Sequence, residues 1–191
     1  AIGERRKIDS MRDAAALYAD LLRDDVGDTG TGDKLGFVKY NDANSLYMTF
    51  EEMSPARRDL INDAGSGLLT DAALDDNSLL LPTCNTGIGW SMQTASLQFG
   101  GAAPADERRQ VMIVLTDGKE NREPWIDDVL DPIESTFTDL SIYSVGVGED
   151  IEPTKLQAIT NVTNGYHQVA PVLSDTTLFD LETFYFKIFA D

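Results

Sequence analysis

Cysteine and histidine are almost absent from this sequence of 191 residues. Cys84 is the single cysteine, which excludes an internal disulfide and a cysteine-rich zinc site. His167 is the single histidine, so most acid–base schemes would have to rest on carboxylates. The sequence also lacks a His-Glu-x-x-His run, a nucleophile elbow and a recognisable Ser/His/Asp set. We therefore expect no catalytic residues and no enzymatic activity, with His167 in a structural or surface role.

Basic residues are scarce as well. The chain has 15 Lys and Arg against 33 Asp and Glu, a net charge of −18. Such an acidic surface repels phosphate backbones and anionic lipid, which argues against nucleic-acid and membrane-surface binding. High-salt adaptation and ordinary selection for solubility both produce this bias, and the two explanations stay open. Apolar runs such as residues 111–115 fall far short of the roughly 20 residues that span a bilayer, so no membrane insertion is expected.

Segments of helical and of strand periodicity alternate from end to end, without internal repeats or low-complexity tracts. This alternation predicts a single α/β domain over residues 1–191. Its architecture is expected to be a doubly wound, mainly parallel sheet with one antiparallel edge strand and helices on both faces. The predicted strands are residues 34–40, 45–50, 111–115, 140–147 and 166–169. The predicted helices cover residues 5–23, 54–64, 86–99, 124–137, 153–160 and 178–188.

Residues 111–118 carry the most informative pattern. The strand 111–115 is apolar on both faces, as expected of a strand covered by helices on each side. Asp117 follows at its C-terminal end, and Gly118 lets the chain turn away. Ligands bind at that edge of open α/β sheets, and a carboxylate there suits a hard cation such as Mg²⁺. A simple turn at Asp117 and Gly118 is the alternative, and this segment alone leaves both open.

Thr86 opens the next candidate segment, at the start of the helix that carries Met92 and Phe99. A threonine hydroxyl at this position is able to coordinate a cation. It is equally able to cap the free N–H groups of the helix, which is the commoner role. The run from Gly87 to Gly89 lacks the third glycine and the lysine of a phosphate loop, which argues against nucleotide binding.

Together these segments carry a resemblance to a known family. The order of elements resembles the von Willebrand factor A family, which has the integrin I-domain fold. The pieces that look like it are IDSMRDAA at 8–15, GFVKYNDA at 36–43, TGIG at 86–89, LTDG at 115–118 and YSVGVG at 143–148. Each piece is weak alone, but five in the right order are specific.

The resemblance implies a metal-ion-dependent adhesion site at the C-terminal edge of the sheet. In the family its ligands come from an Asp-x-Ser-x-Ser loop after the first strand, a Thr on the second loop and an Asp on the third. Thr86 and Asp117 match the last two positions, and the first loop has no match here. The domain is therefore expected to be N-terminally incomplete, without the family's first strand.

The missing strand has a physical consequence. In the family it lies between the strands that correspond to residues 34–40 and 111–115. An empty slot would leave two rows of buried backbone groups unpaired, each at a cost of about 1–3 kcal/mol. We therefore expect that another segment fills the slot, or that residues precede Ala1 in the parent protein.

The resulting functional expectation is cation-assisted binding of a protein ligand, as in an adhesion or interaction module. Mg²⁺, or else Mn²⁺ or Ca²⁺, would be bound weakly by this chain and would accept an acidic side chain of the ligand. The alternative is a structural or assembly domain with a degenerate metal site, which binds partners through its helix faces. An extracellular or cell-surface location is favoured, with a cytoplasmic location as the other possibility.

Overall fold

A computed structural model describes residues 15–25, 32–40, 44–62, 85–100, 109–163, 165–170 and 183–189. These residues fall into two compact units. The first unit takes the described residues of Ala1–Leu35, Phe50–Leu81 and Val172–Asp191, and the second takes those of Gly36–Thr49 and Pro82–Pro171. That residues 1–191 make one domain stays a prediction. Cys84 lies outside the described residues.

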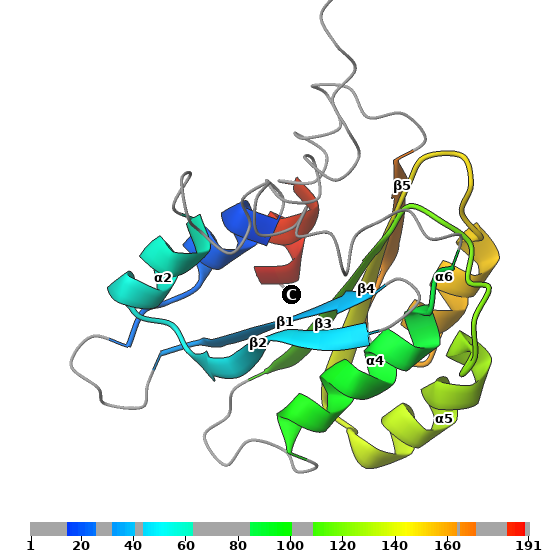
Figure 1. The fold of residues 1–191 in the computed structure, drawn as a ribbon, viewed down its shortest axis with the longest axis horizontal. Coiled ribbons are helices and arrows are strands. Elements are labelled where there is room, and N and C mark those ends of the chain that lie inside the picture. Colours follow the sequence, from blue (N-terminus) through cyan, green and yellow to red (C-terminus); the bar gives the residue numbers. More distant parts are fainter. Residues whose placement is uncertain are drawn as a thin grey trace, which may run out of the picture. The chain divides into compact units, whose positions relative to one another are not determined.

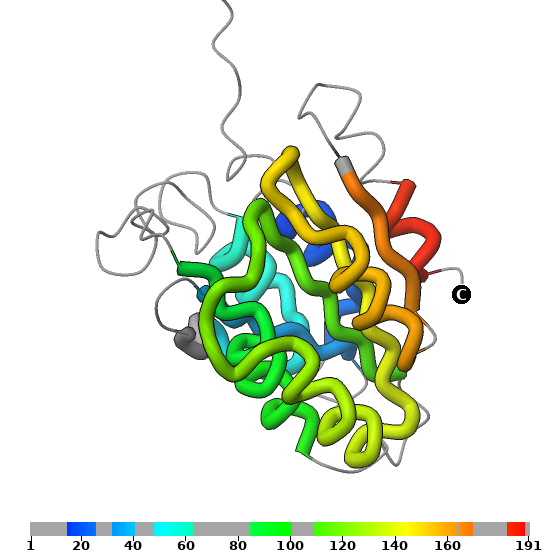
Figure 2. Tube along the Cα trace, turned by 90° about the vertical axis from the view of Figure 1, so that its right-hand side faces the viewer, coloured from blue at the N-terminus to red at the C-terminus, as the bar shows by residue number. Residues whose placement is uncertain are grey.

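The second unit is built on a parallel sheet of three strands in the order β3-β4-β5. The strands are β3 (Gln110–Thr116), β4 (Leu140–Val147) and β5 (His167–Ala170). The register of β3 on β4 runs from Gln110 opposite Leu140 to Thr116 opposite Gly146. Figure 2 shows β4 running between its two neighbours. All C-terminal strand ends therefore meet at one edge.

Three helices pack against this sheet on one side: α4 (Ile88–Ser96), α5 (Ile126–Thr136) and α6 (Pro153–Asn161) (Figure 1). A short 3₁₀ turn, η1 (Leu97–Phe99), extends α4. The three helices share a hydrophobic core with the even-numbered residues of the strands. This core includes Met92, Met112, Val114, Val129, Ile133, Leu140, Ile142 and Leu156. Burial of each such side chain contributes about 1.5–3 kcal/mol.

The central strand is buried on both faces. Tyr143, Val145 and Val147 have no exposed surface, although they lie on the face opposite Ile142. Both faces of β4 are thus covered, as in a doubly wound sheet. The predicted α/β class with a mainly parallel sheet is confirmed.

A separate two-stranded sheet is formed by β1 (Lys34–Tyr40) and β2 (Asn44–Glu52). The pair is antiparallel, as predicted, and its connection lies outside the described residues. Within the part of the chain that the structure describes, no strand joins β1 to β3. That a slot for a further strand lies between β1 and β3 stays a prediction. The Tyr40 hydroxyl donates a 2.5 Å hydrogen bond to the carbonyl oxygen of Leu115 in β3.

The first unit contains α2 (Pro55–Asn62) and the helical residues 15–21 and 183–189. Arg58 of α2 donates to the carbonyl oxygens of Ala19 and Leu22 at the end of the helix 15–21. A cation at this position also compensates the helix dipole. Tyr18 packs its ring against those of Tyr185 and Phe189. The described parts of the first and last predicted helices are thus helical and packed within this unit.

Candidate functional site

Asp117 lies immediately after β3, at the C-terminal edge of the parallel sheet. The turn that follows is held by the Thr116 hydroxyl, which accepts from the Gly118 N–H at 3.4 Å and donates to the Gly118 carbonyl at 3.2 Å. The Asp117 side chain is exposed, and it forms no ion pair with another described residue. The strand therefore presents an accessible carboxylate at the predicted edge.

Thr86 precedes α4 and is half-buried. The residue that caps α4 is Gly87, and it makes no side-chain capping bond. Within the described residues the Thr86 hydroxyl forms no hydrogen bond, so Thr86 does not cap α4. A Cβ atom placed on Gly118 would lie 3.2 Å from Thr86 Oγ1. The hydroxyl of Thr86 therefore sits against the residue that follows Asp117.

Thr86 and the residue that follows Asp117 are thus brought together from loops about thirty positions apart. Whether Thr86 and Asp117 hold a cation stays a prediction. The close approach requires the absence of a side chain at Gly118, since a Cβ there would be tighter than an ordinary van der Waals contact. This packing gives Gly118 a role besides its place in the turn.

Asn121 ties the two loops together, and sequence reasoning did not single it out. The Thr86 N–H donates to Asn121 Oδ1 at 2.7 Å. In return, the Asn121 N–H donates to the Thr86 carbonyl oxygen at 3.1 Å. An asparagine in a charged loop gives no sequence signal of such a pairing.

Glu120 was also missed. Its side chain is fully buried, and its carboxylate accepts from the Gly89 N–H at 2.7 Å and from the Ile126 N–H at 2.8 and 3.0 Å. These N–H groups belong to the first turns of α4 and α5, where helix N–H groups lack partners within the helix. The Lys155 ammonium lies 3.7 Å away. One carboxylate therefore supplies a missing acceptor to two helices.

Burial raises the pKa of Glu120 above its usual range. The hydrogen bonds from Ile126 and Gly89 and the charge of Lys155 oppose this rise, while the nearby carboxylate of Asp127 adds to it. The desolvation cost outweighs the favourable contacts. The partners of Glu120 therefore offset only part of the cost of burying its charge.

Tyr40 brings a third hydroxyl to this edge. Besides its bond to Leu115, its phenol interacts with the Thr116 side chain, and the carboxylates of Asp117 and Glu120 are near enough to affect it. Burial, more than these charges, raises the pKa of Tyr40 above its ordinary value. The phenol is therefore neutral at physiological pH.

The donors present fit part of a cation site. Thr86 and Asp117 offer two oxygens of the kind that Mg²⁺ prefers, whereas Mg²⁺ takes six ligands in octahedral geometry. Within the described ranges no group of three or more His, Cys, Asp or Glu residues could hold a metal ion. A cation bound here would therefore need further ligands from water or from elsewhere.

Comparison with known proteins identifies the fold. No family model matches the chain, and no curated protein matches it. Among solved structures, a von Willebrand factor type A protein from Catenulispora acidiphila superposes with a TM-score of 0.67 at 20% identity, over 94% of this chain and 37% of that one. The chain has the von Willebrand factor A fold.

Two further solved structures agree with this fold. Proximal thread matrix protein 1 from the mussel byssus, with a zinc-occupied MIDAS motif, gives a TM-score of 0.63 at 13% identity, over 95% of this chain and 41% of that one. BatB from Bacteroides thetaiotaomicron gives 0.62 at 14% identity, over 97% of this chain and 89% of that one. The chain thus spans well under half of the first two proteins and most of the third.

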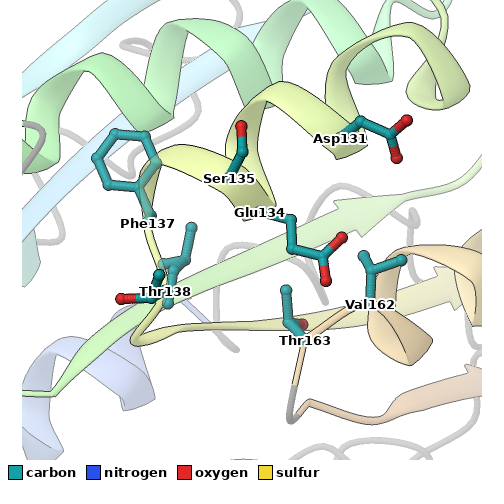
Figure 3. A pocket seen from close by; sticks show the side chains of 8 residues that line it. Asp131, Glu134, Ser135, Phe137, Thr138, Val162 and Thr163 are labelled. Carbon is teal, nitrogen blue, oxygen red and sulfur yellow. The ribbon is translucent and has the colours of Figure 1, made fainter.

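A pocket lies at the opposite end of this von Willebrand factor A fold, near Leu140 at the start of β4. Its other lining residues are Asp131, Glu134, Ser135, Phe137, Thr138, Val162 and Thr163. The Glu134 carboxylate points toward Val162 and Thr163 (Figure 3). None of the residues of the candidate site lines this pocket, so it has no part in that site.

No described helix has the length and apolar character needed to cross a membrane.

Proposed function

We propose that this chain is a protein-binding module in which a divalent cation beside Thr86 and Asp117 accepts a carboxylate of the ligand. The proposed activity is binding and not catalysis, and the proposed setting is the cell surface or the extracellular space. The observation that carries the proposal is the approach of the Thr86 hydroxyl to Gly118, the residue that follows the exposed Asp117 at the C-terminal edge of a parallel sheet. Crevices at that edge are where open α/β sheets bind ligands.

The charge of the chain supports a role for the cation. With a net charge of −18, the protein repels an acidic partner unless a positive charge stands between them. A bound divalent ion is the largest local charge in its site and reverses this repulsion. The zinc-occupied MIDAS motif of proximal thread matrix protein 1 supports divalent metal binding on this fold.

An assembly domain with a degenerate metal site is the second candidate. Two observations favour it: the described residues supply only two oxygens of the expected set, and Leu97 of η1 is 73% exposed. Such a domain would bind its partner through helix surfaces without a cation. The two candidates therefore differ in their response to metal.

Metal titration separates them. Mn²⁺ added to the ¹⁵N-labelled chain should broaden the NMR signals of Thr86 and Asp117 first, because its unpaired electrons act over short distances. Asp117→Ala should abolish this selective broadening. Asp131→Ala is the matched control, since it removes an exposed aspartate beside the distant pocket and should leave the broadening intact.

The ligand count sets the expected strength. One carboxylate and one neutral hydroxyl leave most positions of Mg²⁺ to water, so calorimetry on this chain should record weak or unmeasurable binding. An N-terminal extension that supplies a strand and an Asp-x-Ser-x-Ser loop should raise the affinity at least tenfold, about 1.4 kcal/mol. No gain in the extended chain, or tight binding that survives Asp117→Ala, would contradict the proposal.

A further inference from the structure

The segment 86–89, which leads into α4, is tied to the loop after Asp117 at both of its ends. At one end, Thr86 exchanges two hydrogen bonds with Asn121, of 2.7 and 3.1 Å. At the other end, the Gly89 N–H donates to Glu120 at 2.7 Å. Because Glu120 and Asn121 are adjacent, the two contacts fix both the position and the direction of the segment. A single hydrogen bond would leave it free to pivot.

Glu120 is itself held in place. Its carboxylate also accepts from Ile126 at the start of α5, and Lys155 of α6 lies 3.7 Å away. A buried carboxylate is tolerated only where such partners satisfy it, and they leave it one orientation. Glu120 is therefore a rigid support for Gly89, anchored on two other helices.

We propose that Glu120 and Asn121 are positioning residues, which together hold the Thr86 hydroxyl beside Asp117. They form a clamp that aligns the two oxygens before any cation arrives. Groups behind metal ligands orient those ligands and commonly change metal affinity by about 10- to 100-fold. This consequence for metal affinity rests on the proposed function, whereas the placement of Thr86 is testable without metal.

The placement itself is the first readout. In the native chain, NOE contacts should join the Thr86 side chain to the α-protons of Gly118, because Oγ1 packs against that residue. Asn121→Ala and Glu120→Ala should lose these contacts while the signals of β3, β4 and β5 stay dispersed. Glu120→Gln should retain them, since Oε1 alone lies 2.7 and 3.0 Å from the N–H groups of Gly89 and Ile126.

The second readout is the selective Mn²⁺ broadening of Thr86 and Asp117. It should weaken by about tenfold or more in Asn121→Ala, measured as the Mn²⁺ concentration that gives equal broadening. Asp128→Ala is the matched control, because it removes an acceptor at the start of α5, 3.0 Å from the Trp125 N–H, without touching Thr86. This control should lose stability but keep both readouts.

The outcomes separate the two proposals. Folded Asn121→Ala with unchanged Thr86–Gly118 contacts would overturn the clamp, and so would an equal loss in Asp128→Ala. If Glu120→Ala does not fold, the Asn121→Ala variant alone tests the clamp, since the side chain of Asn121 is exposed. If native protein shows no Mn²⁺ broadening but Asn121→Ala loses the Thr86–Gly118 contacts, the metal-dependent function fails and the clamp stands.

Discussion

Replacing Gly89 by alanine adds one methyl group where the first turn of α4 meets the loop that leads into α5. A Cβ at this position would lie 2.5 Å from the Pro124 carbonyl oxygen and 2.5 Å from the carbonyl carbon of Trp125. Both are backbone atoms, so no side chain is able to swing aside. Ordinary van der Waals contact begins at 3.4 Å, and the turn must therefore retreat by about 0.9 Å.

A retreat in the direction away from Glu120 also breaks a hydrogen bond. The Gly89 N–H lies 2.7 Å from Glu120, and a shift of that size directly away from it would exceed hydrogen-bonding distance. Overpacking of this kind costs about 1–3 kcal/mol. Loss of a hydrogen bond to a charged group costs about 1.5–3 kcal/mol. The better helix propensity of alanine offsets about 0.5–1 kcal/mol, so we expect a net loss of about 1.5–5.5 kcal/mol.

Urea unfolding followed by circular dichroism measures this loss. Gln93→Ala, at an exposed position of the same helix, is the control and should change stability by less than about 0.5 kcal/mol. Helix propensity alone predicts that Gly89→Ala is more stable than the native protein by about 0.5–1 kcal/mol. A variant that equals or exceeds the native stability would therefore refute the packing argument.

Three further substitutions test other contacts. Tyr40→Phe should cost about 1–3 kcal/mol in urea unfolding, because it leaves the Leu115 carbonyl without its 2.5 Å donor; an unchanged midpoint would show that water replaces the hydroxyl. The stability of Glu120→Gln relative to the native protein should increase as pH rises above 4.5. A raised pKa means that native Glu120 binds a proton more readily in the folded state than in the unfolded state, so the native protein loses stability through that window. A stability difference between the two that stays constant with pH would contradict the raised pKa. Gly118→Ala should change stability by less than about 1 kcal/mol, because the flexible Thr86 side chain at 3.2 Å is able to move, yet it should shift the Thr86 NMR signals; a large loss would place backbone against Gly118.

The positions of the strands and helices can be predicted from the sequence because they depend on residues that are close together in the chain. The strand β4 occupies residues 140–147 as predicted, since its apolar residues and flanking turns are read directly from the sequence. The helix α5 begins at Ile126, two residues later than predicted, where Asp128 accepts the Trp125 N–H. Thr86 and Asp117 could be named as candidates because strand ends and helix starts converge at one edge of a parallel sheet, and their role as metal ligands stays a prediction.

Glu120 could not be found in this way. It follows Lys119 and precedes Asn121 and Arg122, a run that is typical of a solvated loop. Its burial depends on N–H groups that Gly89 and Ile126 contribute from two helices, one of them 31 positions distant. The Tyr40–Leu115 bond likewise spans 75 positions. Contacts of this range come from the assembled fold and have no local signal.

The edge of β3 that faces away from β4 has a consequence for handling the protein. Within the described residues, β3 hydrogen-bonds to a neighbouring strand on one side only, and its sequence QVMIVLT carries no charge and no proline. Strands with those properties are templates for pairing with other molecules, and charged or bulged edges are how natural proteins avoid it. Where no other segment of the chain covers this edge, copies of the chain should therefore self-associate through β3 as concentration rises. A soluble strand-forming peptide that occupies this edge should act as an inhibitor of that aggregation.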